Sequence, residues 1–254
     1  MDKIIKLNNL NIFYQEYGKG DKNILLFHGW GQSHVFWKDI SARLSQEYHL
    51  YVLDLPGFGR SQEPPSVWNI KKYAKFIHAF VIKLQITKPI LIGHSFGGRI
   101  AIIYASQFFV KKLILYSTGG GLPEKSLLKT VHKYVFVKIG KYLFPNFLYK
   151  CYSIFFRPKN YQNKIIINKK RSRRMLDIYS QPSQNLDQAL DQIVAKTLII
   201  VGQKDFITKP TIGREMHALI KNSELIKIPN ATHFAHIEAP NIFYETVEKF
   251  LKED

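Results

Sequence analysis

The stretch Ile90-Leu-Ile-Gly-His-Ser-Phe-Gly-Gly98 decides the fold of this 254-residue chain. Its apolar start predicts a short buried strand, and helical spacing of apolar residues resumes directly after Gly98. Between them lies a G-x-S-x-G pentapeptide with Ser95 at its centre, the context in which a strained turn holds an exposed nucleophile. Gly93 and Gly97 flank the serine where the strand and helix backbones nearly touch, so a Cβ would collide there. An ordinary Gly-rich turn could carry the same pentapeptide, and the rest of the chain has to decide.

Apolar runs and helical patterns alternate along most of the chain. Strands are predicted over residues 4–7, 11–17, 24–27, 50–53, 89–92, 113–116, 197–201 and 225–228, and helices over 33–46, 67–84, 98–109, 210–220 and 240–251. This alternation predicts an α/β fold with a mostly parallel central sheet flanked by helices. Residues 119–190 break the pattern, being mostly helical, aromatic and basic. We expect them to form an inserted helical cap on a core made of residues 1–118 and 191–254.

Three polar side chains follow the ends of predicted strands, namely Ser95, Asp205 and His233. In parallel sheets, ligands bind beyond the carboxyl ends of the strands. A serine hydroxyl needs a base to act as a nucleophile at neutral pH, and His233 can supply it while Asp205 orients the imidazole. Asp205 could instead be a turn or helix-capping residue, and His236 is a rival base. The order Ser, Asp, His is that of α/β-hydrolases.

A tetrahedral oxyanion needs two hydrogen-bond donors. The backbone N–H of Phe96, directly after the serine, is one candidate, and we expect the Trp30 N–H to be the second because Gly29 lets that loop turn toward the site. His28, Gly29 and His94 lie in the same segments and are candidate substrate-binding residues, although the two imidazoles are better suited to orienting loops.

The inserted segment is rich in large apolar side chains, among them Phe144 and Phe147, which we assign to the substrate pocket. An apolar pocket with few polar groups suits a medium acyl chain or an aromatic ester. These side chains could also serve only to pack the cap onto the core. The histidines and carboxylates show no metal-binding spacing, and the glycines form no nucleotide-binding motif, so no metal or cofactor is expected.

The formal net charge of +18 is concentrated in one segment. Residues 125–174 hold 14 of the 37 Lys and Arg residues and no acidic residue, which leaves 23 basic against 19 acidic residues elsewhere. This distribution favours an anionic partner at the cap, or it reflects general use of lysine as a solvated residue. An anionic membrane surface is another interpretation, and nucleic acid is not expected because no binding motif accompanies the charge.

Neither a signal peptide nor a transmembrane segment is predicted, because no apolar run is long enough. The single cysteine, Cys151, excludes an internal disulfide framework. Both observations favour a cytoplasmic location.

The chain resembles the α/β-hydrolase family over residues 4–118 and 190–252. The motifs that carry this likeness are His28-Gly-Trp-Gly31, Asp54-Leu-Pro-Gly-Phe-Gly-Arg-Ser61, Gly93-His-Ser-Phe-Gly-Gly98, Gly202-Gln-Lys-Asp205 and His233-Phe-Ala-His-Ile-Glu238. The resemblance implies Ser95 as nucleophile, Asp205 as acid, His233 as base, and residues 120–190 as a cap. A serine at the elbow argues against the dehalogenases and epoxide hydrolases of this family, which use aspartate there.

The first functional hypothesis is a serine carboxylesterase that cleaves a small-molecule ester through an acyl-enzyme. The basic cap and His28-Gly-Trp-Gly31 look like the family's esterases that demethylate pimeloyl-acyl carrier protein methyl ester, which would make the acidic acyl carrier protein a partner. Hydrolysis of a C–C bond in a vinylogous diketone uses the same three residues and is the alternative reaction. A non-enzymatic ligand or lipid-surface binder is the alternative of another class.

Overall fold

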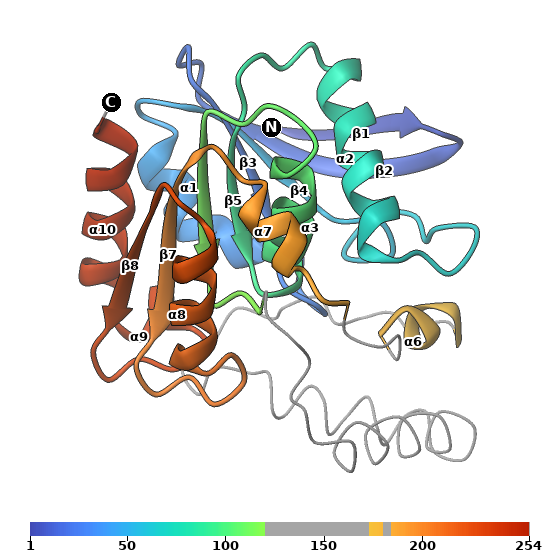
Figure 1. Ribbon diagram of the computed structural model, residues 1–254. Helices are drawn as coiled ribbons and strands as arrows, with labels where there is room; N and C mark the ends of the chain where they lie inside the picture. Colours follow the sequence, from blue (N-terminus) through green and yellow to red (C-terminus); the bar gives the residue numbers. More distant parts are fainter. Residues whose placement is uncertain (120–172, 180–183, 254) are drawn as a thin grey trace.

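The computed structural model describes residues 1–119, 173–179 and 184–253, and within these ranges it contains one eight-stranded sheet (Figure 1). The strand order is β1-β2-β4-β3-β5-β6-β7-β8. Strand β2 pairs antiparallel with both β1 and β4, and all other neighbours are parallel. The strands are β1 (Asp2–Leu7), β2 (Leu10–Tyr17), β3 (Asn23–Phe27), β4 (His49–Leu53), β5 (Ile90–His94), β6 (Lys112–Tyr116), β7 (Lys196–Gly202) and β8 (Ser223–Ile228). The predicted, mostly parallel sheet is confirmed.

Helices cover both faces of this sheet (Figure 1). They are the 3-10 helix η1 (His34–Trp37) and the α-helices α1 (Lys38–Leu44), α2 (Ile70–Lys83), α3 (Phe96–Ala105), α6 (Arg173–Tyr179), α7 (Asp187–Asp191), α8 (Pro210–Leu219), α9 (Ala235–Glu238) and α10 (Pro240–Lys252). Successive side chains of a strand point to opposite faces. In β3, Leu25 and Phe27 pack with α2 and α3, whereas Ile24 and Leu26 pack with α1 and α10. Apolar layers on both faces explain why the central strands read as continuous apolar runs.

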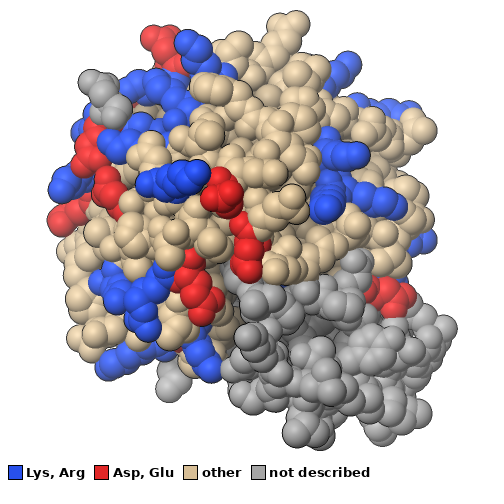
Figure 2. Space-filling view, viewed as in Figure 1, with Lys and Arg blue, Asp and Glu red and all other residues tan. Residues whose placement is uncertain are grey.

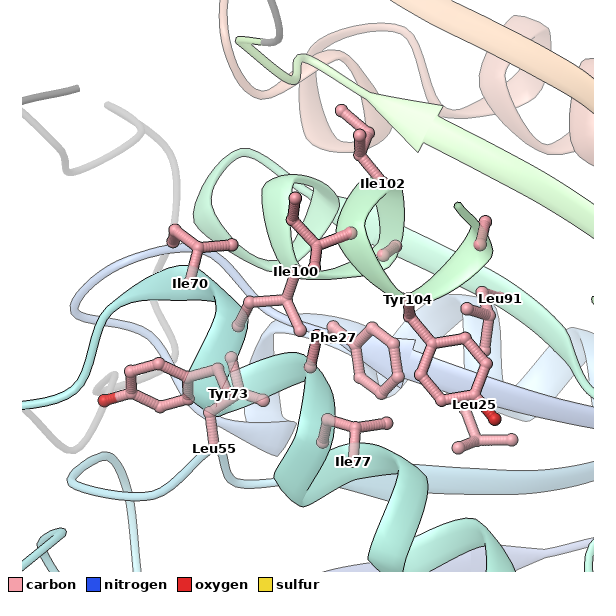
Figure 3. Close-up of a cluster of buried hydrophobic side chains, with 14 of the residues drawn as sticks. Leu25, Phe27, Leu55, Ile70, Tyr73, Ile77, Leu91, Ile100, Ile102 and Tyr104 are labelled. Atoms are coloured by element: carbon pink, nitrogen blue, oxygen red, sulfur yellow. The ribbon is translucent and has the colours of Figure 1, made fainter. Parts of the chain in front are cut away.

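Figure 3 shows the larger of the two apolar layers, where α2 and α3 meet the sheet. The labelled side chains come from five segments: Leu25 and Phe27 of β3, Leu55 after β4, Ile70, Tyr73 and Ile77 of α2, Leu91 of β5, and Ile100, Ile102 and Tyr104 of α3. Helix α3, which follows Ser95, therefore has its apolar side chains fixed against β3, β5 and α2. This packing anchors the turn at the head of α3.

The sequence predicted the ends of several helices only approximately, because local contacts determine where each one begins and ends. Helix α2 begins at Ile70, not at residue 67, because the Asn69 side chain caps it by accepting the Lys72 backbone N–H at 2.9 Å. The helix expected over 33–46 is a 3-10 turn followed by the short α1, and α3 ends at Ala105, four residues before the expected end. The β1–β2 hairpin turns at Asn8 and Asn9, both with positive φ, which suits a two-residue hairpin loop.

The inserted segment begins after β6 and ends before β7. Most of residues 119–190, including Phe144 and Phe147, lies outside the described residues, so the predicted cap and its boundaries stay a prediction. Of this segment, α6 contacts the loop after β4: Met175 is fully buried against Gly57, and Arg174 Nη1 donates to the Pro64 carbonyl at 2.8 Å. In the parts of the chain that the structure describes, no helix is long and apolar enough to cross a membrane.

Candidate active site

Ser95 lies between the end of β5 and the first residue of α3. Its φ of 50° and ψ of −110° are unusual for a residue with a Cβ, and such strain persists only where the surroundings enforce it. The Ser95 N–H donates to the Tyr116 carbonyl of β6 at 3.0 Å, and its side chain makes no capping hydrogen bond with α3. The serine hydroxyl is therefore not used to stabilise the helix that it precedes.

The two glycines beside Ser95 allow the strand and helix backbones to approach closely. A Cβ on Gly97 would lie closer than 3.0 Å to the carbonyl oxygens of Phe27 and His28, and a Cβ on Gly93 would meet the backbone of Gly98. The close approach expected from the sequence is confirmed. The turn at Ser95 is thus built against the end of β3, where the Gly29-Trp30 loop begins.

Asp205 and His233 form a buried pair that joins the ends of β7 and β8. His233 Nδ1 lies 2.8 Å from Asp205 Oδ2, and both residues are only 2 % exposed. The other carboxylate oxygen, Oδ1, accepts the backbone N–H groups of Ile207 and Thr208, each at 2.8 Å. Asp205 therefore makes the turn contacts expected of a loop residue and also orients an imidazole.

His236, the rival base, lies deeper in the protein. Its Nδ1 is 3.0 Å from the Tyr116 hydroxyl, its Nε2 has no hydrogen-bond partner among the described residues, and burial lowers its pKa to about 3. The same Tyr116 hydroxyl lies 3.2 Å from the His233 carbonyl oxygen, and burial raises the Tyr116 pKa well above its usual value. A histidine buried in this way stays neutral near pH 7, and it has no carboxylate partner to stabilise an imidazolium as His233 has in Asp205, which favours His233 as the base among the described residues.

Trp30 and Phe96, the candidate oxyanion residues, lie in contact. Their rings are 5.1 Å apart and perpendicular, and Phe58 from the loop after β4 packs edge-on against Trp30 at 4.9 Å. Tyr73 of α2 contacts Phe96 on another side, with ring centroids 5.3 Å apart. Trp30 and Phe96 are each partly exposed, whereas Phe58 and Tyr73 are buried. The site thus has an aromatic wall beside the serine.

His28 and His94 are buried, and the ring nitrogens of each contact neighbouring loops. His28 Nε2 accepts the Leu55 N–H at 3.1 Å, and its Nδ1 lies 2.7 Å from the Gly29 carbonyl oxygen. His94 lies 3.2 Å from both Gln32 Oε1 and the His233 carbonyl oxygen. These contacts favour the loop-orienting role over direct contact with a substrate. A Cβ on Gly29 would come within 3.0 Å of His94 Nδ1 and Gln32 Oε1, so any larger residue there would displace these two side chains.

Sequence reasoning missed several residues that shape the site. Phe58, Gln32, Tyr116 and Thr208 all contact the predicted residues or their loops. Phe58 and Gln32 could have been found, because each lies inside or directly after a quoted motif. Tyr116 gave no signal, since in sequence it is only the last residue of an apolar strand. Among the described residues, no group of three or more His, Cys, Asp or Glu side chains could hold a metal ion.

Comparison with known proteins agrees with this geometry. The model of the alpha/beta hydrolase family matches residues 24–246. The chain belongs to this family. Its fold is that of an alpha/beta hydrolase, and it is a hydrolase of that superfamily with esterase-like relatives.

Three similar proteins place the chain among the alpha/beta hydrolases. A pimeloyl-[acyl-carrier protein] methyl ester esterase of Wigglesworthia glossinidia brevipalpis is 28 % identical, over 94 % of this chain and 97 % of its own length. A 2-hydroxy-6-oxononadienedioate/2-hydroxy-6-oxononatrienedioate hydrolase of Pseudomonas putida is 24 % identical, over 96 % of this chain and 92 % of its own length. The solved esterase of Exiguobacterium antarcticum superposes with a TM-score of 0.85 over all of both chains at 21 % identity, which shows a shared fold.

Proposed function

We propose that the protein is a serine hydrolase that cleaves carboxylic esters through an acyl-enzyme intermediate. Ser95 is the nucleophile, His233 the general base, and Asp205 the residue that orients the imidazole. The observation that carries this proposal is the 2.8 Å contact between His233 Nδ1 and Asp205 Oδ2, in a loop whose backbone is hydrogen-bonded to His94, the neighbour of Ser95. With its Nδ1 proton directed to Asp205, the imidazole keeps its Nε2 lone pair for the serine proton.

In the first half of the reaction, Ser95 Oγ attacks the ester carbonyl carbon while His233 Nε2 takes the hydroxyl proton. The C–Oγ bond forms, and the carbonyl oxygen becomes a negatively charged oxyanion. His233 then returns the proton to the departing alcohol oxygen as the ester C–O bond breaks. The buried Asp205 carboxylate stabilises the imidazolium that forms in between.

In the second half, water replaces the alcohol. His233 takes a proton from the water molecule, which attacks the acyl carbon, and then returns it to Ser95 Oγ as the acyl–serine bond breaks. The backbone N–H groups of Trp30 and Phe96 stabilise both oxyanions. Phe96 is the first residue of α3, so its amide lies at the positive end of the helix dipole. The close packing of the Trp30 and Phe96 rings holds these two segments against each other.

The proposed substrate is an ester of an acyl chain or an aromatic acid, because aromatic residues lie next to Ser95. The partly exposed rings of Trp30 and Phe96 offer apolar surface beside Ser95, and the buried rings of Phe58 and Tyr73 pack behind them. Apolar surface of this kind suits an acyl or aromatic group better than a hydrophilic one. The named activity of the Wigglesworthia relative, a methyl ester esterase, supports this choice. By its name, the Pseudomonas putida relative hydrolyses a 2-hydroxy-6-oxo dienedioate or trienedioate, and this supports hydrolysis of a C–C bond in a vinylogous diketone as the second candidate.

The acyl carrier protein is the proposed partner at residues 125–174. This segment carries 14 basic and no acidic residues, and 12 of the 14 lie outside the described residues. By contrast, the described face in Figure 2 carries both basic and acidic side chains. We propose that residues 119–190 form the cap, that this cap binds the acidic carrier, and that the enzyme acts in the cytoplasm.

A series of p-nitrophenyl esters of increasing acyl length tests the proposal. We expect turnover by the wild-type protein, none by Ser95→Ala, and covalent labelling of Ser95 by a serine-directed phosphonate. A dienoate diketone substrate included in the same series tests the second candidate, and a preference for it over every ester would replace the first. Binding without turnover in both forms would indicate a non-enzymatic binder.

A further inference from the structure

A chain of hydrogen-bond contacts runs across the floor of the site, from the oxyanion loop to the loop of the proposed base. The Gly29 N–H donates to Gln32 Oε1 at 2.8 Å, and this oxygen lies 3.2 Å from His94 Nδ1. On the other side of the ring, His94 Nε2 lies 3.2 Å from the carbonyl oxygen of His233. Gln32 and His94 are buried, with exposed fractions of 8 % and 1 %. The contacts therefore connect three segments that are distant in sequence without involving solvent.

Both ring nitrogens of His94 face oxygen acceptors. The orientation of the Gln32 amide is set by the Gly29 N–H, since the opposite orientation would direct its NH2 group at that donor. Burial, with the nearby imidazoles of His233, His236 and His28, lowers the pKa of His94 well below its usual value, so the ring is neutral and has one N–H to donate. A single proton therefore serves two acceptors.

Tyr116 allows either position of that proton. When the His94 proton is on Nε2, it bonds the His233 carbonyl oxygen. When it is on Nδ1, it bonds Gln32 Oε1, and the Tyr116 hydroxyl, also 3.2 Å from that carbonyl oxygen, can donate in its place. The backbone of His233 is thus held in both cases, whereas Gln32 provides the anchor for Gly29 in both.

We propose that Gln32 and His94 are positioning residues that keep the Gly29-Trp30 loop and the His233 loop in register on either side of Ser95. This inference rests on the proposed function, because it assigns the two residues to the placement of the oxyanion donor and the base. Gln32 fixes the backbone directly before the Trp30 amide. His94 joins that loop to the backbone of the base and also stacks on Phe36, with ring centroids 4.5 Å apart.

Replacement of Gln32 by Leu and by Glu separates positioning from packing. Gln32→Leu removes the acceptor for Gly29, and we expect kcat on a p-nitrophenyl ester to fall by roughly 10- to 100-fold with KM changed less than about threefold, because a displaced oxyanion donor acts only in the transition state. The Gln32→Glu variant keeps an oxygen that accepts the Gly29 N–H, so its kcat should stay within about threefold of the wild-type value. Asn69→Leu is the matched control, since it also removes an amide oxygen that accepts one backbone N–H, at the start of α2.

The nitrogen NMR signals of the His94 ring report the bridge independently of activity. In the wild type we expect a neutral ring with both tautomers populated. Gln32→Leu should shift the ring to the Nε2–H tautomer, and Gln32→Glu, whose carboxylate faces Nδ1, should shift it to the Nδ1–H tautomer. Equal spectra in all three proteins, or a Gln32→Leu enzyme with wild-type kcat, would overturn the inference.

Failure of the two proposals can be told apart. If the wild type hydrolyses no ester, or Ser95→Ala retains turnover, the proposed function fails while the ring spectra still test the bridge. If Ser95→Ala is inactive and Gln32→Leu is fully active, the positioning role alone fails.

Discussion

Two buried aspartates in this protein have nearly the same surroundings. Asp205 follows β7, accepts two backbone N–H groups, and lies 2.8 Å from His233 Nδ1. Asp54 follows β4, accepts the backbone N–H groups of His34 at 2.6 Å and Arg60 at 2.7 Å, and lies 2.9 Å from His34 Nδ1. Each is therefore a carboxylate at a strand end that holds a loop and an imidazole. By local chemistry alone, the two pairs could not be assigned different roles.

The pairs differ in what lies beyond the imidazole. The His233 ring is 4.8 Å from the ring of His94, which precedes the strained Ser95. The His34 ring is 4.8 Å from the ring of Phe13 in β2, and His34 is the first residue of η1. Under the proposed function, the His233 pair acts on Ser95, whereas the His34 pair fixes the loop at the start of η1.

The largest expected effect is at the serine. Ser95→Ala should lower kcat on p-nitrophenyl esters by about 10⁵- to 10⁶-fold, since loss of a nucleophile costs about as much as loss of the whole triad. Steady-state assays measure kcat, and labelling with a serine-directed phosphonate shows whether the variant still contains a reactive serine. Ser106→Ala, at the other end of the same helix α3, is the matched control, because its hydroxyl bonds only the Ile103 carbonyl oxygen. Wild-type turnover in Ser95→Ala would remove the basis for assigning different roles to the two pairs.

Asp205→Asn should lower kcat by about 10⁴-fold, because an amide favours the wrong imidazole tautomer at His233. The Asn side chain can still accept the Ile207 and Thr208 N–H groups through its single oxygen, so the loop should keep its structure. Steady-state kinetics together with a melting curve measure both effects. A decrease in kcat below about tenfold would mean that Asp205 only shapes its turn.

Asp54→Asn is the corresponding change in the other pair, and it should act mainly on stability. The single amide oxygen cannot serve His34 and Arg60 together, so one partly buried backbone N–H loses its acceptor, at a cost of about 1 kcal/mol in the free energy of unfolding. We expect kcat to stay within about tenfold of the wild type. Urea unfolding measures the stability, and a 10⁴-fold loss of kcat in a folded Asp54→Asn protein would show that the two pairs are functionally equivalent.

The smallest effect concerns His236 and appears as a pH dependence of stability. Its pKa is about 3 in the folded protein and near 6.5 in the unfolded chain, so between these values the unfolded chain binds more protons and stability falls as pH falls. From pH 7 to pH 5, this group alone removes about 2 kcal/mol from the free energy of unfolding. His236→Asn should lose less stability over the same range in urea titrations. An equal loss in both proteins would mean that His236 is not held neutral.

The order of the strands and helices could be predicted from the sequence because it depends on local patterns. Apolar runs such as Ile24 to Phe27 are buried on both faces, and Gly93 is required by the turn itself, because a Cβ there would meet the backbone of Gly97 and Gly98. The candidate residues Ser95, Asp205 and His233 were found for the same reason, since each directly follows a strand and the ends of parallel strands share one edge of the sheet.

Only the tertiary structure decided which of these residues act on one another. Asp205 contacts both its own turn and His233, and Asp54 contacts His34 in a similar way. His94 bridges Gln32 and the His233 backbone. These contacts join segments up to 139 residues apart. Strand spacing carries no information about such contacts, because they form only when the sheet brings β3, β5 and β8 to one edge. The physical reason is that most buried polar groups must be hydrogen-bonded to be stable, and the packed fold determines which partner is close enough.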